Sequence, residues 1–214
     1  MWLEGFSHVP KVRFLDARTI RIEDVYDFAW EKAAPVSKGW ITRTIAPEDL
    51  VRAHLLSEQF RSWGASHAFV CFETVLDPIC ISIEARRRVG QPYSMIKGLF
   101  GAFELIYLFG SSRDSIGKRL DRGHDIDSCE LILSPDELWE FFANLSRAAQ
   151  VNAESPAHYH TLRRNCVTEL FRALPGAPKP PRLPKHAGPL LVSIDRAHPC
   201  DIYDAQYPPP FLKG

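Results

Sequence analysis

The sequence lacks any segment that would carry the chain across a membrane. No run of about 20 apolar residues is present, although a helix needs roughly that length to span a bilayer. The first residues also lack the continuous apolar core of a secretory signal peptide. The longest apolar run, residues 99–109, contains Glu104 and is typical of a strand in a protein core. We therefore expect the chain, as given, to be soluble.

An excess of charge of one sign is missing as well. The 26 Lys and Arg residues balance the 26 Asp and Glu residues, so the formal net charge is +0 at pH 7. A chain without net positive charge has no long-range attraction for nucleic acid or for an anionic membrane. We expect no nucleic-acid partner, whereas the local run Arg86, Arg87 and Arg88 leaves association with a membrane surface open.

Closely spaced cysteine pairs are also absent. The five cysteines include no C-x-x-C pair, which argues against a zinc site built from cysteines. Their odd number predicts at least one free thiol. His158 and His160 have the spacing of two metal ligands on a strand, but no acidic or cysteine partner accompanies them. We expect neither a metal nor a cofactor.

The hydrophobic patterns that are present predict an α+β fold, with an antiparallel sheet packed against helices. Apolar spacing favours helices, and short β-branched or aromatic runs favour strands. We expect helices at 47–63, from Ser134 onward and at 166–174, and strands at 17–25, 66–74, 79–85, 102–110 and 126–133.

The predicted elements fit one domain. A chain of 214 residues can bury one sizeable core, and Pro175-Gly176 stops the last predicted helix. We expect a single catalytic domain over residues 1–176. Residues 177–214 are rich in proline and are predicted to form a wrapping or partly disordered C-terminal extension.

Cys166 is the strongest candidate nucleophile. It follows Asn165, a residue that commonly caps helices, so its sulfur should lie in the first turn. Unpaired backbone N–H groups there favour a thiolate and can stabilise an oxyanion. Arg163 and Arg164 would add positive charge nearby. The alternative is a buried cysteine that only fills space beside an apolar helix.

His67 is the predicted base for Cys166. Residues 66–74 and 79–85 should form a hairpin around Asp77-Pro78. If the hairpin closes symmetrically around Val75 and Leu76, His67 faces Glu84, and directly opposed Cβ atoms are about 5 Å apart. A carboxylate at that distance can orient an imidazole. A slip of two residues would instead place Ser82 or Arg86 opposite His67.

Several segments resemble one bacterial family when they are taken in order. The blocks are SHAFVCFE, ISIEARRRVGQPYS, KGLFGAFELIYL, SSRDSIGKRL and PAHYHTLRRNCVTEL, preceded by VYDF. Each is similar to a block of the family named for the Lnb N-terminal periplasmic domain. The chain departs from the family pattern at Ser112, where an acidic residue is usual, and at His160, where Asn is usual.

The resemblance implies a permuted papain-like fold related to NlpC-type cysteine peptidases. It also implies thiol acyl-transfer chemistry, since Lnb moves an acyl chain on bacterial lipoproteins. The family's catalytic His and Cys match His67 and Cys166, and its acidic third member is carried onto Glu84. A periplasmic location is implied, although no export signal in these residues requires it and a cytoplasmic location stays open.

We therefore expect a cysteine-dependent acyltransferase or hydrolase that works through a thioester acyl-enzyme. Its catalytic residues would be Cys166, His67 and Glu84, and its substrate an acyl-bearing lipid, lipoprotein or peptide. The alternatives are a cell-wall peptidase or amidase, and a catalytically silent domain that binds a lipid or a protein. Nothing in the sequence indicates the oligomeric state.

Overall fold

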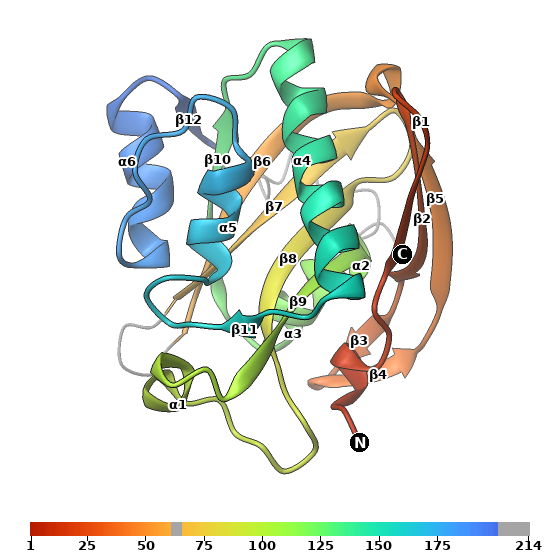
Figure 1. Cartoon of the computed structure of the whole chain (residues 1–214), viewed down its shortest axis with the longest axis vertical. Coiled ribbons are helices and arrows are strands. Elements are labelled where there is room, and N and C mark those ends of the chain that lie inside the picture. Colours follow the sequence, from red (N-terminus) through yellow and green to blue (C-terminus); the bar gives the residue numbers. More distant parts are fainter. Residues whose placement is uncertain (61–65, 201–214) are drawn as a thin grey trace.

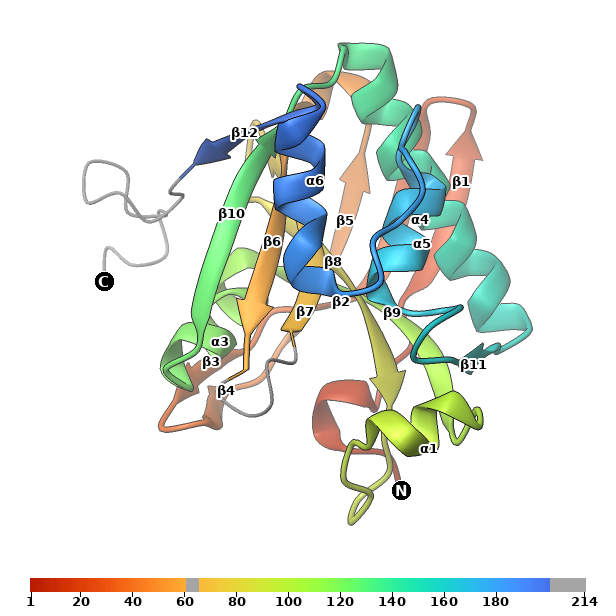
Figure 2. The same cartoon turned by 90° about the vertical axis from the view of Figure 1, so that its left-hand side faces the viewer.

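One mixed sheet runs through the computed structural model, which describes residues 1–60 and 66–200 (Figures 1 and 2). Its strand order is β1-β2-β9-β8-β7-β6-β10-β12, with β5 paired to β2 and β11 paired to β9. The bounds are β1 Lys11–Asp16, β2 Thr19–Tyr26, β5 Trp40–Ile45, β6 Leu50–Gln59, β7 Ser66–Thr74, β8 Ile79–Arg86, β9 Phe103–Ser111, β10 Asp125–Leu131, β11 His158–Tyr159 and β12 Ala197–Cys200. These pairs are antiparallel except β2–β9, which is parallel.

Helices cover both faces of this sheet. On one face lie α4 (Pro135–Glu154), α5 (Cys166–Ala173) and α6 (Ala187–Ser193). The other face carries α2 (Ser112–Ser115), α3 (Gly117–Asp121) and the small hairpin of β3 (Ala29–Glu31) and β4 (Ala34–Ser37). The remaining helical elements are α1 (Met95–Leu99), η1 (Glu4–Phe6), η2 (Pro47–Asp49) and η3 (Pro184–His186). The α+β prediction is confirmed.

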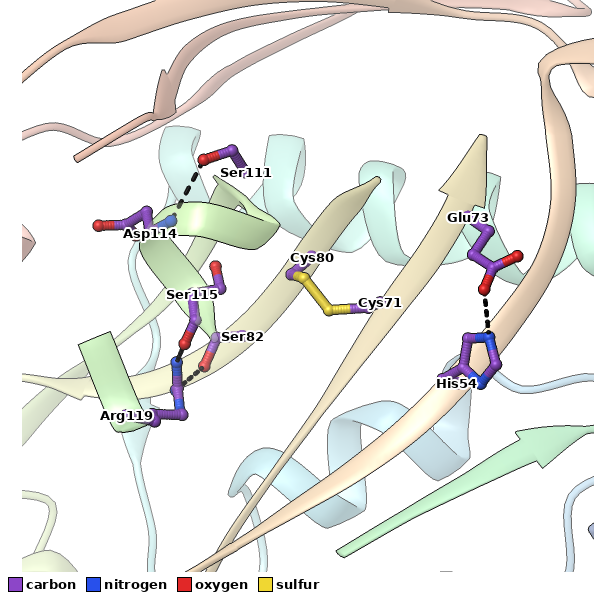
Figure 3. Close-up of a disulfide and its surroundings, with 9 residues drawn as sticks. All are labelled: His54, Cys71, Glu73, Cys80, Ser82, Ser111, Asp114, Ser115 and Arg119. Carbon is purple, nitrogen blue, oxygen red and sulfur yellow. Dashed lines mark hydrogen bonds and ion pairs between the residues drawn. A yellow bond between two sulfur atoms is a disulfide. The ribbon is translucent and has the colours of Figure 1, made fainter. Parts of the chain in front are cut away.

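The predicted hairpin forms with the expected register. Strands β7 and β8 pair Cys71 with Cys80 and Phe69 with Ser82, which is the symmetric closure around Val75 and Leu76. The slip by two residues is therefore excluded. Cys71 and Cys80 are joined by a disulfide on the sheet face that also holds Leu56, Phe69 and Ile116 (Figure 3).

The helix predicted over residues 47–63 is wrong for residues 47–60, which the structure describes. Only Pro47–Asp49 form a short 3-10 turn, and the chain then enters β6 between β7 and β10. Helices cover the sheet on both sides here, so residues 53–58 are buried regardless of which face they occupy. Burial on both faces removes the alternation that identifies a strand from sequence. Residues 61–63 of the prediction lie outside the described residues.

The other two predicted helix starts are confirmed, and local side-chain bonds explain them. The Ser134 hydroxyl accepts from the Glu137 N–H, while the Glu137 carboxylate accepts from the Ser134 N–H at 2.9 Å. This reciprocal cap satisfies two backbone donors that a helix leaves unpaired at its start. None of the helices in the described residues is both long and apolar enough to span a bilayer.

Part of the predicted C-terminal extension packs on the main core. Helix α6 buries Ala187 and Leu191 there, and β12 adds an antiparallel edge strand to β10 that buries Ala197. The hydrophobic core therefore continues past residue 176, as far as residue 197. Residues 201–214 of the predicted extension lie outside the described residues.

Replacing Leu191 by Ala should lower the free energy of unfolding by about 2–4 kcal/mol, because the side chain is 1% exposed and its loss leaves a cavity. The measurement is urea unfolding followed by circular dichroism. Ile194→Ala, just beyond the same helix and 43% exposed, is the matched control and should cost less than about 0.5 kcal/mol. Equal effects would contradict the packing of α6 on the core.

Candidate active site

Cys166 is the first residue of α5, as its local sequence predicts. The Asn165 side chain accepts from the Thr168 N–H at 3.0 Å, and the Thr168 hydroxyl accepts from the Asn165 N–H at 2.8 Å. This cap sets where the helix starts and so where the sulfur lies. Cys166 is 2% exposed and lines a cleft of about 440 Å³.

His67 and Glu84 line the same cleft. The β7–β8 ladder ends at Phe69 and Ser82, so these two residues lie just beyond it on paired strands. Their side chains nevertheless meet, with His67 Nε2 3.2 Å from Glu84 Oε1. The structure thus brings the three residues predicted from sequence together in one cleft.

Ser82 is a fourth member of this cluster that the sequence analysis did not assign to it. Its hydroxyl donates to Glu84 Oε1 at 2.8 Å and lies 2.8 Å from His67 Nε2. A hydroxyl that donates to Glu84 can accept from an N–H on Nε2, which assigns the proton to that nitrogen. The other ring nitrogen of His67, Nδ1, is then left for the Cys166 thiol.

The charges of His67 and Glu84 stabilise each other. Burial lowers the pKa of His67, but the Glu84 carboxylate and then the Cys166 thiol outweigh it and raise that pKa to about 10. Burial likewise opposes ionisation of Glu84, yet the charges of His67 and Arg119 hold its pKa well below the usual range. At neutral pH the cluster therefore contains an imidazolium and a carboxylate.

Arg119 connects Glu84 to a second buried carboxylate, and the sequence analysis did not assign this role either. Its guanidinium lies 3.3 Å from Glu84 Oε1 and donates through Nε to Glu58 Oε2 at 2.8 Å. Glu58 also pairs with His124, and Arg119 stacks on the Phe69 ring at 4.1 Å. The available sequence signal was the position of Arg119 beside Ile116 and Leu120, two apolar residues at the i, i+4 spacing of a helix face.

The two arginines expected to add positive charge near the thiol, Arg163 and Arg164, lie at the protein surface. Arg164 Nε lies 3.7 Å from Glu169, whose carboxylate also accepts from the Tyr107 hydroxyl, and both Arg163 and Arg164 are exposed. The positive charge nearest to the thiol in this cluster is that of His67. The charge of Arg164 is thus partly neutralised by Glu169.

Tyr159, on β11, lines the same cleft as Cys166. Burial, the charge of Cys166 and a hydrogen bond with Tyr93 together raise the pKa of Tyr159 well above its usual range. The nearby His160 is engaged locally, since its Nδ1 accepts from the N–H groups of Leu162 and Arg163 at 3.2 Å. This hydrogen bonding makes His160 part of a turn.

The rest of the cleft combines apolar and cationic side chains. Its apolar lining includes Phe6, Phe60, Tyr93, Met95, Leu162 and Leu183, and its cations beyond Arg119 are Arg87, Lys118, Arg122 and Arg182. Two of these groups, Arg182 and Leu183, belong to the segment after residue 176. Such a lining suits a molecule that has both an apolar part and a negative charge.

Comparison with known proteins identifies one family. The model of the family described as the Lnb N-terminal periplasmic domain matches residues 37–198, which include His67, Glu84 and Cys166. The match extends past residue 176 and covers α6 and the first half of β12. No curated protein and no solved structure matches the chain.

The ring of His67 should keep its proton up to about pH 10, as NMR titration of its ring resonances would measure. This folded-state pKa exceeds the unfolded value of about 6.5, so protonated His67 stabilises the fold fully below pH ~6.5. That contribution is lost as the pH rises toward 10.

Glu84→Gln removes the largest favourable charge and should lower the pKa of His67 toward neutrality. Glu104→Gln on the neighbouring strand β9 is the matched control, because Glu104 pairs with Arg86 at 3.4 Å. An unchanged His67 titration in Glu84→Gln would contradict the assigned ion pair.

Proposed function

The chain belongs to the Lnb N-terminal periplasmic domain family, and from this premise we propose that it is a cysteine-dependent acyltransferase or hydrolase. The observation that carries the proposal is the convergence of Cys166, His67 and Glu84 in one cleft of about 440 Å³. The order of a histidine strand before a cysteine helix supports a permuted papain-like arrangement of the NlpC type. The family description names no activity, and the proposed chemistry rests on these three residues.

In the first half-reaction the Cys166 sulfur attacks the carbonyl carbon of an ester or amide. A carbon–sulfur bond forms, and the bond from that carbon to the leaving oxygen or nitrogen breaks. The proton of the thiol is already held at Nδ1 of the charged His67, which passes it to the leaving group. Glu84 and Ser82 hold the opposite ring nitrogen, which keeps the imidazole oriented throughout.

The negative charge that develops on the carbonyl oxygen needs hydrogen-bond donors. The backbone N–H of Cys166 lies at the start of α5, where helices leave N–H groups without intrahelical partners. The Tyr159 hydroxyl, close to the thiol, is a second candidate donor.

In the second half-reaction water or another nucleophile, deprotonated by His67, displaces the acyl group from the sulfur. Water gives a hydrolase, and an amine or alcohol gives a transferase.

An acyl-bearing amphiphile is the substrate class that the cleft surroundings favour. Beside the cleft, Ile96 and Phe100 are 70% and 85% exposed, and Leu162 is exposed too. Residues 85–103 and 155–168 contain no acidic residue and carry several cations, Lys97 among them. Exposed apolar side chains within a basic surface are typical of proteins that bind anionic lipid. We propose that this rim of the cleft, formed by Ile96, Phe100, Leu162 and the cations around them, docks on a membrane.

The periplasm is the proposed location. The family is named for a periplasmic domain, and the Cys71–Cys80 disulfide supports an oxidising compartment, since disulfides persist there and are rare in the cytosol. Oxidising conditions are compatible with a free thiol at Cys166 because the cleft buries the sulfur.

Incubation with acyl-bearing substrates should leave the acyl mass on Cys166, because the proposed intermediate is a thioester. The substrates are a phospholipid, a lipopeptide and a muropeptide, and the measurement is mass spectrometry of the intact and digested protein. Cys166→Ala should form no adduct. Glu84→Gln should slow the reaction by about two to four orders of magnitude, as loss of an orienting carboxylate does elsewhere.

Adduct formation from the muropeptide alone would favour the cell-wall peptidase or amidase instead. No adduct from any substrate, with full activity of Cys166→Ala in the cell, would indicate a catalytically silent domain. Glu104→Gln serves again as the matched control for Glu84→Gln, and it should react at the wild-type rate.

Vesicles that contain phosphatidylglycerol should bind the protein, and Phe100→Ser and Ile96→Ser should weaken binding severalfold, because each removes apolar surface that would enter the bilayer. Cosedimentation measures this, with pure phosphatidylcholine vesicles for comparison. Leu76→Ser in the β7–β8 turn, where Leu76 is exposed, is the matched control. Equal loss in the control, or no binding by the wild type, would contradict membrane docking through this rim.

A further inference from the structure

A second cysteine has the same two types of neighbour as Cys166. Cys200, at the end of β12, places its sulfur 3.5 Å from Nδ1 of His54 on β6. The opposite ring nitrogen, Nε2, lies 3.0 Å from Glu73 Oε1 on β7 (Figure 3). Cysteine, imidazole and carboxylate thus form a continuous chain of contacts, with the carboxylate on the far side of the ring.

This cluster is separate from the cleft. Glu73 and His67 are six residues apart on β7, which at about 3.3 Å per residue is about 20 Å. The two clusters therefore lie at different ends of the same central strands. The residues around Cys200 also differ from those of the cleft, since Arg52 pairs with Glu73 at 3.0 Å and Ser128 Oγ lies 3.6 Å from the sulfur.

His54 carries a positive charge at neutral pH. Burial lowers its pKa, but hydrogen bonds and charges from Cys200 and Glu73 outweigh burial and raise that pKa to about 9. The imidazolium lies within contact of the sulfur, where a cation stabilises the charge that a cysteine acquires when it reacts. The neighbouring Cys129 has no such partner within residues 1–60 and 66–200, where its thiol is directed to the Leu55 carbonyl, and burial raises its pKa to about 12.

We propose that Cys200, His54 and Glu73 form a second reactive-thiol site, at which small hydroperoxides oxidise Cys200. His54 is buried and Cys200 is partly buried, so a small reagent reaches the sulfur more easily than a bulky substrate. Glu73 and Arg52 are about half exposed and place the cluster at the protein surface.

The proposed step is a two-electron oxidation of the thiol. The Cys200 sulfur attacks the terminal peroxide oxygen, so that a sulfur–oxygen bond forms as the oxygen–oxygen bond breaks. The thiol proton, held at Nδ1 of the charged His54, passes to the departing oxygen, which leaves as water or an alcohol. The thiol is oxidised to a sulfenic acid while the hydroperoxide is reduced. Glu73 holds His54 in the orientation this transfer needs.

The test uses the full chain with Cys166→Ser, which removes the cleft thiol from the measurement. The protein is treated with hydrogen peroxide and dimedone, and sulfenic acid at each cysteine is quantified by peptide mass spectrometry. We expect Cys200 to react about tenfold faster than in His54→Gln, because the variant loses the adjacent cation. Glu73→Gln should slow the reaction by a smaller factor, since it weakens the contact that orients the His54 ring but leaves the ring in place.

Glu130→Gln is the matched control, because Glu130 pairs with Arg52 at 3.4 Å and leaves the Glu73–His54–Cys200 contacts in place. It should react at the wild-type rate. Cys129 reports on folding, since it stays protected unless the sheet opens. If Cys129 becomes labelled in His54→Gln, that variant has unfolded. The comparison then rests on Glu73→Gln, because the Glu73 side chain is about half exposed and its replacement disturbs the fold less. Equal rates at Cys200 in the wild type and in a folded His54→Gln or Glu73→Gln variant would overturn the proposal.

Discussion

The buried ionic cluster of Glu58, Arg119, Glu84 and His67 is the constraint on which the rest of the cleft depends. It joins β6, α3, β8 and β7, and each charge lies near another of opposite sign. Taking charged groups out of water costs several kcal/mol per ion, which only close pairing offsets. The strands and α3 must therefore keep one relative arrangement, and the same arrangement orients His67 toward Cys166.

The three free thiols in the described residues differ because of their neighbours. Cys166 faces a cleft and His67, Cys200 faces His54 at the sheet edge, and Cys129 lies in the core with its thiol directed to the Leu55 carbonyl. Burial alone makes a cysteine inert, as at Cys129. A nearby imidazole whose far nitrogen contacts a carboxylate reverses that effect, because it brings a positive charge to the sulfur.

The segment after residue 176 contributes to the candidate site as well as to the core. Helix α6 and β12 bury apolar residues against the sheet, while Arg182, Leu183 and Pro184 form one wall of the cleft. The family match over residues 37–198 includes this segment. Prolines interrupt regular hydrogen bonding, so composition indicates an irregular path but not whether that path packs against the protein.

The sequence by itself determined the features that local rules control. Alternation and the Asp77-Pro78 turn specified the hairpin that carries His67 and Glu84, and the Asn165 cap specified where α5 and Cys166 begin, whereas the structure selected the register of the hairpin. Only the tertiary structure decided that residues 50–59 form a strand, that Arg119 and Ser82 contact Glu84, and that His54 meets Cys200, 146 positions away. Caps, turns and strand alternation act within a few residues, whereas burial on two faces and charge pairing depend on which distant segments pack together.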